Sequence, residues 1–428
     1  MSLISDEFAV YLPAVNSHYA SYLAKPAPEN RPLPSGFTLD DLKFWEKSSK
    51  LWHHPHFLHS VGSYAVGSIP DNAVTRRGRT DGVLFGDSGG YQIGKGSLQG
   101  LPPALKAGAS ADDAVTAWRN AYEVRAWIIN WLETNTNYAM TIDMPLWATN
   151  EFGKDSPFHK CTHQQLIDLT VENLMLIDKM RQDRTKWLNV IQGGTTPDFM
   201  RWWNAVKWFP SSGYALSSGI GKTSGLGAFL EVLLLMRDDN AFDAGHDWIH
   251  VLGISTAPWA IMFTAMQMGL RATANSSLRI SYDSASPFHD SDIYEKYELL
   301  PALGTNAGSW AVTSKSAPQS RLYVGSQDPL PFSSPVADKL TLGDLNVADG
   351  MFKNRQFDPI STLYLSNHNV WTYLQAFQNA NMAAFFEYNR PIPPLFSECL
   401  DVINGAFISE AWNEYITSHR MLLSSFAG

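Results

Sequence analysis

Eight apolar segments alternate with helical patterns along the first 290 residues, and this alternation restricts the fold more than any other feature. Short apolar runs bounded by glycine and polar residues are typical of buried strands. Strands that alternate with helices indicate a parallel sheet, and eight of them fit a closed (β/α)8 barrel, the TIM barrel. The sequence therefore predicts an α/β barrel. Its expected strands occupy residues 8–15, 57–63, 82–87, 138–145, 187–194, 213–221, 248–254 and 278–284.

The alternation stops near residue 290, which indicates a change of organisation. Residues 305–360 are rich in Ser, Pro, Gly and Asn and are expected to form loops. We therefore expect a barrel core over residues 1–290 and a loop-rich, helical C-terminal region over 291–428 that completes the barrel surface. The expected helices occupy residues 39–51, 110–134, 164–181, 199–209, 226–237, 261–270, 366–384 and 409–423.

Polar residues stand where several of these strands end. Asp87, Asp143, Gln192 and Asp283 each follow an apolar run. Because the carboxyl ends of barrel strands surround one pocket, we expect these four side chains to meet there. Asp87 is followed by Ser-Gly-Gly, whose glycines allow the backbone to approach a ligand closely. An alternative role for Asp87 is to cap the helix that follows it.

The composition limits the classes of function that the protein can have, but it does not identify one. The net charge is -9 and the pI about 5.7, so a nucleic-acid partner would need a local basic face. Two basic clusters, at 76–79 and 179–186, are candidates, although each could be an ordinary solvated surface. The two cysteines, Cys161 and Cys399, argue against a disulfide framework and against a cysteine-based zinc site. Since neither a signal peptide nor a membrane span is evident, we expect a cytoplasmic protein.

Three carboxylates and one carboxamide at a barrel mouth suit two chemical tasks. A carboxylate accepts hydrogen bonds from the donors on a purine edge, while a carboxamide both donates and accepts. A further pair of carboxylates suits glycosyl transfer, in which one attacks the anomeric carbon and the other handles protons. The pattern therefore favours chemistry on a nucleoside.

The motifs around these residues resemble the active-site motifs of tRNA-guanine transglycosylases. The resemblance spans roughly residues 8–290, with a weaker echo at 366–369. It implies a modified (β/α)8 barrel that exchanges a guanine in nucleic acid for a 7-deazaguanine base. In order, the matching segments are DSGGYQ at 87–92, VIQGG at 190–194, GYAL at 213–216, VLGI at 251–254 and YD at 282–283.

The resemblance also implies catalytic and base-reading roles. Asp283 matches the nucleophile that attacks C1′ and forms a covalent glycosyl-enzyme, and two displacements at this carbon retain its configuration. Asp87 matches the general acid/base that protonates the leaving guanine and deprotonates the incoming base. Asp143, Gln192 and the backbone at Gly193 match the groups that read the guanine edge.

Four further positions match residues that hold the base. Tyr91 and Leu252 resemble the side chains that sandwich the purine, and stacking on an aromatic ring is a common way to hold a flipped base. Ser217 and Ser218 stand where the family has glycines whose backbone touches the base. The two serines are a departure from the family pattern at this contact.

Two other departures bear on the cofactor and the substrate. The family's C-terminal zinc site uses three closely spaced cysteines and a histidine; His368 matches the histidine, but no cysteine lies between residues 162 and 398. We therefore expect no zinc and no other cofactor, with a surface or capping role as the alternative for His368. In addition, residues 284–290, SASPFHD, lack the arginine that follows the nucleophile in bacterial tRNA enzymes.

With these departures, the sequence resembles the DNA-guanine transglycosylases, the phage-associated branch that modifies DNA. The implied partners are DNA and a 7-deazaguanine such as preQ0, in the host cytoplasm if a phage encodes the protein. Such an enzyme must extrude its target guanosine from the duplex. We expect phosphate contacts near the strand ends, and the candidates are Arg76, Arg77, Arg79, Lys95 and Lys222.

Three alternatives remain at this point. The first is a tRNA-guanine transglycosylase with an altered anticodon contact. The second is a non-catalytic partner subunit, against which the presence of both Asp87 and Asp283 argues. The third is an unrelated barrel glycosidase, which the base-reading pair Asp143 and Gln192 disfavours. The sequence leaves the oligomeric state open, with a homodimer as one option.

Overall fold

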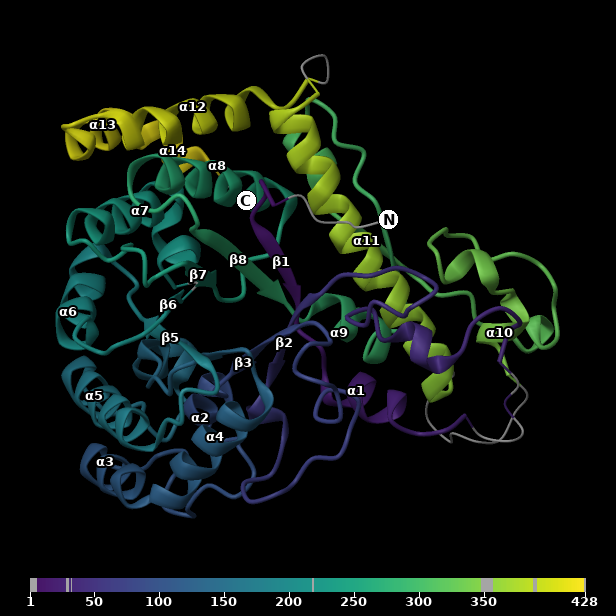
Figure 1. Ribbon diagram of the computed structural model, residues 1–428, viewed down its shortest axis with the longest axis horizontal. Helices are drawn as coiled ribbons and strands as arrows, with labels where there is room; N and C mark the ends of the chain where they lie inside the picture. The colour runs from purple at the N-terminus through teal and green to yellow at the C-terminus, as the bar shows by residue number, and fades with distance from the viewer. Residues whose placement is uncertain are drawn as a thin grey trace.

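Eight parallel strands form one sheet that curls into an almost closed barrel (Figure 1). This computed structural model describes residues 6–27, 31, 33–217, 219–347, 357–387 and 391–426, without the side chains of 220 and 222–224. A parallel bridge between Ala14 and Leu58 joins the two edge strands. The predicted (β/α)8 barrel is confirmed. Its strands are β1 Val10–Pro13, β2 His56–Ser60, β3 Val83–Asp87, β4 Tyr138–Met140, β5 Lys186–Ile191, β6 Gly213–Leu216, β7 Trp248–Val251 and β8 Arg279–Ser284.

Helices cover the outside of this ring (Figure 1). Several begin with a side-chain cap, as Thr162 does for α5 and Thr256 for α8, which satisfies backbone N–H groups at the helix start. The helices of the barrel region are α1 Ser17–Leu23, α2 Gly90–Lys95, α3 Ala111–Asn120, α4 Tyr122–Asn135, α5 His163–Met180, α6 Thr196–Val206, α7 Gly219–Asp238, α8 Ala257–Thr273 and α9 Ser286–Asp292.

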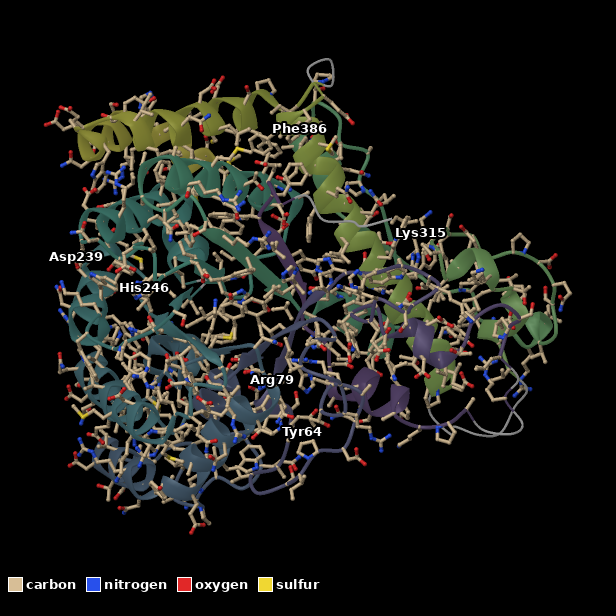
Figure 2. All side chains as sticks on the ribbon, viewed as in Figure 1. Tyr64, Arg79, Asp239, His246, Lys315 and Phe386 are labelled. Atoms are coloured by element: carbon tan, nitrogen blue, oxygen red, sulfur yellow. The ribbon has the colours of Figure 1, made fainter. Side chains whose placement is uncertain are left out.

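The pleat of the strands decides which residues reach the site. Successive side chains of a strand point alternately into the barrel and outward to the helices. Inside, Phe85 stacks on Tyr138 with 4.7 Å between ring centroids, and Trp248 lies 5.1 Å from each ring. Side chains therefore fill the space within the strands (Figure 2). Asp87 follows Phe85 by one pleat repeat, which places it on the same inward face one level nearer the carboxyl ends.

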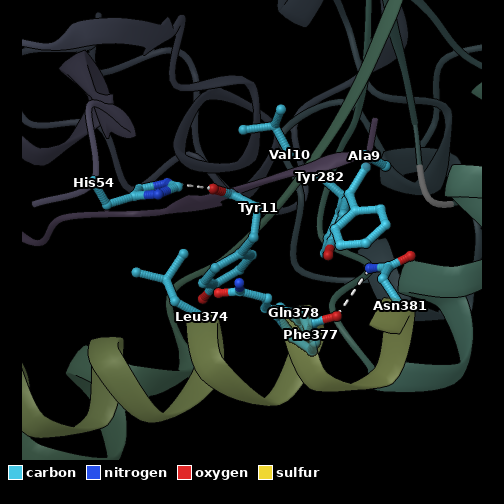
Figure 3. A pocket seen from close by; sticks show the side chains of 10 residues that line it. Ala9, Val10, Tyr11, His54, Tyr282, Leu374, Phe377, Gln378 and Asn381 are labelled. Carbon is cyan, nitrogen blue, oxygen red and sulfur yellow. Dashed lines mark hydrogen bonds between the residues drawn. The ribbon is translucent and has the colours of Figure 1, made fainter. Parts of the chain in front are cut away.

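The C-terminal region packs against the β1 and β8 side of the barrel. Helix α11 contacts β1, α8 and α9, and α12 lies along α8 (Figure 1). Figure 3 shows the contact with β1, where Tyr11 and Tyr282 lie 4.9 and 5.5 Å from the ring of Phe377 beside a cavity of only about 30 Å³. The elements of this region are β9 Lys296–Leu299, β10 Thr313–Ser316, α10 Leu342–Leu345, α11 Pro359–Phe385, α12 Pro394–Ile408, α13 Trp412–Ser418 and α14 Arg420–Ser425.

Several predicted boundaries are wrong for identifiable reasons. The helix expected over 39–51 is only a short turn, Leu39–Leu42, because the Asp41 carboxylate accepts from the backbone N–H groups of Thr38 and Lys50 and holds a loop. The helix expected over 110–134 is two helices, α3 and α4, since Ala121 leaves the helical conformation. The last predicted helix, 409–423, is divided between α13 and α14, and the sequence interpretation missed α12 and the antiparallel pair of β9 and β10.

Among the described residues, none of the helices combines the length and the apolar character that a membrane crossing requires.

Candidate active site

The carboxyl ends of the strands surround a cleft of about 750 Å³. This volume falls within the range of small-molecule binding sites. The strands β2, β3 and β8 and the loops after β4, β5, β6 and β7 supply its walls. Eight of the residues singled out in the sequence line it, namely Asp87, Tyr91, Asp143, Gln192, Gly193, Ser217, Leu252 and Asp283. The structure therefore brings together side chains from six different strand ends.

Asp87 lies at the end of β3 and faces the cleft. Its carboxylate accepts from the Ser60 hydroxyl and, at 3.3 Å, from the backbone N–H of Gly89. Burial nevertheless raises the pKa of Asp87, and the charge of Asp283 raises it further. The cap of helix α2 is Gly89, without a side-chain cap, so the alternative of Asp87 as a helix cap is wrong.

Gly89 explains why this turn needs glycine. Its φ is 80°, and a Cβ at this position would lie 2.9 Å from the Cα of Gly62. An L-residue would therefore be both strained and crowded here. The next residue, Gly90, lines the cleft, and a Cβ there would lie 3.0 Å from Oδ1 of Asp143. The first glycine thus shapes the turn, and the second leaves room beside a carboxylate.

Asp143 and Gln192 form a buried pair at the cleft. The Nε2 of Gln192 donates to Oδ2 of Asp143 at 2.6 Å, and both side chains are less than a tenth exposed. Burial raises the pKa of Asp143 to about 7 in spite of this hydrogen bond, and the negative charge of Asp87 adds to the effect. Asp143 is therefore poised between its neutral and ionised forms near neutral pH.

Asp283 is held from one side. Its Oδ1 accepts from the backbone N–H of Gly253 at 2.8 Å and lies 3.2 Å from Nε2 of His250. The side chain is 14% exposed and lines the same cleft as Asp87. A carboxylate with one anchored oxygen presents its other oxygen in a defined direction, which suits a nucleophile.

An aromatic wall continues from the cleft. Tyr91 is 54% exposed, and its ring centroid lies 5.5 Å from that of Trp147, which in turn lies 5.3 Å from Phe152. The ammonium group of Lys95 lies 4.2 Å from the ring centroid of Phe152 and donates to its carbonyl oxygen. Rings of this kind can stack on bases, and the cation favours phosphate. Leu252 also lines the cleft and packs on the barrel interior.

Two of the five predicted phosphate contacts, Arg77 and Arg79, lie at the opposite end of the barrel. Arg79 donates to carbonyl oxygens at the end of α4 and just before β5, and Arg77 donates to the carbonyl oxygen of Asn135. Arg76 pairs with the exposed Asp71. The expectation that Arg77 and Arg79 lie near the carboxyl ends of the strands is wrong, because both satisfy carbonyl groups that the end of α4 leaves unpaired. Arg76 stays a candidate for a phosphate contact.

The other predicted contacts have mixed outcomes. Lys95 lies beside the aromatic wall and stays a candidate. The side chain of Lys222 and the whole of Ser218 lie outside the described residues. Ser217 lines the cleft, and its backbone N–H donates to the carbonyl oxygen of Ile191, so this N–H is already used within the sheet.

His368 is a core residue. It is 2% exposed, its Nε2 donates to the carbonyl oxygen of Glu298 at 3.0 Å, and its ring lies 4.4 Å from that of Phe332. Burial lowers its pKa to about 4. The alternative of a surface or capping histidine is therefore wrong. Across the part of the chain that the structure describes, no three His, Cys, Asp or Glu side chains cluster as a metal site.

The sequence interpretation missed several residues that the structure places at the site. Ser60 donates to Asp87, His250 contacts Asp283, and Trp147 lines the cleft. Ser60 and His250 belong to inward-facing rows of strands, so the alternation of the pleat is a signal that could have found them. A scan against protein-family models and a search of curated proteins find no match for this chain.

Proposed function

We propose that the protein is a guanine transglycosylase that exchanges a guanine in DNA for a 7-deazaguanine base. The observation that carries the proposal is the meeting of four side chains in one cleft: Asp87 and Asp283, which can perform glycosyl transfer, and the pair Asp143 and Gln192, which can read a purine. The motif resemblance supplies the reaction, and the geometry supports it by bringing these groups together.

The first half of the reaction removes guanine. Oδ2 of Asp283 attacks C1′ of the nucleotide while the bond from C1′ to N9 breaks and its electron pair moves into the base. The raised pKa of Asp87 favours a carboxyl group that can give its proton to the departing guanine. The products are free guanine, an ionised Asp87 and an ester between Asp283 and the sugar.

The second half inserts the new base. The carboxylate of Asp87 takes the N9 proton of a 7-deazaguanine, and this nitrogen attacks C1′. The ester bond to Asp283 breaks and returns the electron pair to its carboxylate. Because C1′ is displaced twice, its configuration is retained. The scheme needs no metal or redox partner for its atoms and electrons to balance.

The buried pair fits the recognition of either base. Guanine and 7-deazaguanines share the N1–H and amino donors, which a carboxylate can accept. They also share the O6 acceptor, for which the Gln192 amide and the backbone N–H of Gly193 are suitable donors. Asp143 is most useful here when ionised, and a pKa of about 7 keeps its charge within reach near neutral pH.

An exchange assay tests the proposal and separates the polymers. Purified protein is incubated with radiolabelled guanine and either duplex DNA, single-stranded DNA or tRNA, and incorporation is measured. We expect incorporation into DNA that the Asp283→Ala variant abolishes. Incorporation into tRNA alone would assign the tRNA reaction. No incorporation into any polymer, with a folded protein, would contradict the proposal and favour a non-catalytic partner subunit or a different glycosyl reaction.

A further inference from the structure

A buried chain of polar groups lies behind Asp283. The indole Nε1 of Trp248 donates to Oγ of Ser281 at 2.7 Å, and the same Oγ lies 2.9 Å from Nδ1 of His250. The other ring nitrogen, Nε2, lies 3.2 Å from Oδ1 of Asp283. His250 and Ser281 are fully buried inside the barrel. These residues thus connect the packed interior to the proposed nucleophile.

The hydrogen-bond donors and acceptors of these polar groups determine the tautomer of His250. An indole nitrogen can only donate, so Ser281 must accept from Trp248. The hydroxyl proton of Ser281 then needs an acceptor, and Nδ1 of His250 is the one that lies within reach. If Nδ1 accepts, a neutral imidazole carries its proton on Nε2, on the side of Asp283.

No other group among the described residues competes for this proton. Among the described residues, Nε2 of His250 has no other hydrogen-bond acceptor, and the atom is shielded from solvent. At 3.2 Å its contact with Asp283 has the length of a hydrogen bond but not yet the alignment. A small rotation of the carboxylate about its own side-chain bonds would align the two groups.

We propose that His250 is a positioning residue for Asp283: its Nε2–H, set by Ser281, and the backbone N–H of Gly253 hold Oδ1, so that Oδ2 is the oxygen that bonds to C1′. This assignment rests on the proposed function. Oδ1 becomes the carbonyl oxygen of the ester and can still accept, so the backbone N–H of Gly253 keeps its acceptor and Nε2–H of His250 gains one. When the ester breaks, the two donors stabilise the charge that returns to the carboxylate.

The neutral form of the histidine matters for this role. A cationic partner would stabilise the ground-state carboxylate strongly and weaken it as a nucleophile. A neutral N–H orients the carboxylate and lowers its nucleophilicity less than a cation would. His250 therefore orients Asp283 without touching the substrate.

The histidine tautomer can be measured without any activity. Protein labelled with 15N-histidine is studied by long-range 1H–15N correlation, and the His250→Gln variant identifies the His250 signals among the 12 histidines. We expect a neutral ring protonated on Nε2, and the Ser281→Ala variant should lose this preference. A ring protonated on Nδ1, or on both nitrogens, would overturn the assignment.

Single-turnover kinetics test the positioning role. Formation of the covalent adduct with guanine-containing DNA is timed for the His250→Phe and His250→Gln variants, and guanine affinity is measured at equilibrium. Phe offers no donor and should slow adduct formation by about tenfold to a hundredfold, with guanine affinity unchanged. Gln can offer an N–H in place of Nε2 and should restore most of the rate.

Control variants distinguish a failure of the positioning role of His250 from a failure of the proposed function. His54, buried between β1 and α11 with its Nε2 on the carbonyl oxygen of Tyr11, provides a matched His54→Gln variant that should leave the rate unchanged. Equal losses in the His250→Phe and His250→Gln variants, at unchanged melting temperature, would overturn the positioning role. A wild-type protein with the expected tautomer but no exchange on any polymer would overturn the proposed function and leave the tautomer assignment standing.

Discussion

Replacing Asp143 by asparagine should make the protein more stable at alkaline pH and less able to bind guanine. Burial, assisted by Asp87, raises the pKa of Asp143 from 3.8 to about 7 in the folded protein. Between these values the unfolded chain has released a proton that the folded protein still holds, so stability falls as the pH rises from about 4 to about 7. A shift of this size corresponds to about 4 kcal/mol of unfolding free energy at most.

Asparagine has a similar shape and no titration, so Asp143→Asn should gain between about 2 and 4 kcal/mol over the wild type at pH 8, and this gain should shrink toward pH 4. Denaturant unfolding at pH 4, 6 and 8 measures the difference. The exposed Asp155→Asn serves as the control for the removal of a surface carboxylate and should change the unfolding free energy little. A destabilised Asp143→Asn variant at pH 8 would refute the reasoning about this buried carboxylate.

The same substitution should weaken guanine binding at pH 8 by about 1–3 kcal/mol, because the base donors lose a charged acceptor. Isothermal titration with guanine or a 7-deazaguanine measures this effect. Unchanged affinity would remove Asp143 from the base-reading role. A variant that is both more stable and weaker in binding would show that the site maintains an ionisable group at the expense of folding stability.

Other changes separate structural from functional residues. Arg79→Ala should lower the unfolding free energy by about 0.5–1.5 kcal/mol, because carbonyl groups at the end of α4 lose their donor, and should leave DNA affinity unchanged; weaker DNA binding at unchanged stability would contradict this. Lys95→Ala should weaken DNA binding and make it less dependent on salt, and should leave the unfolding free energy unchanged. Gly89→Ala should lower exchange activity, since its φ of 80° and the contact with Gly62 shape the Asp87 turn; full activity would contradict this. Metal analysis should find no stoichiometric zinc, and a bound zinc would show that the C-terminal region was misinterpreted.

The barrel could be predicted because its signal is repeated. Each of the eight strands is a short apolar run, and errors of a few residues at the ends do not change the count or the order. The carboxyl ends of such strands meet by topology alone, so the common location of Asp87, Asp143, Gln192 and Asp283 followed from the fold. The C-terminal region lacks such repetition, and for this reason the β9 and β10 pair was missed.

Local contacts between distant segments could not be predicted in the same way. Arg77 and Arg79 are close in sequence to the Asp87 strand but precede its amino end, and their partners at the end of α4 follow more than fifty residues later. The role of His250 depends on Ser281 and Asp283 of the adjacent strand, and this register is set by the sheet as a whole. His368 was predicted to be a surface or capping residue because histidine is polar, and its packing on Phe332 could not be inferred from the sequence.

The covalent intermediate provides the most direct test of the account. Protein is incubated with guanine-containing DNA, quenched in acid, digested and analysed by mass spectrometry for peptides that carry a base-free deoxyribose phosphate. The account predicts an ester at Asp283, which disappears in the Asp283→Asn variant and is discharged when a 7-deazaguanine is added before the quench. A deoxyribose phosphate attached to Asp87 or to any other residue, or base exchange without an adduct at Asp283, would contradict it.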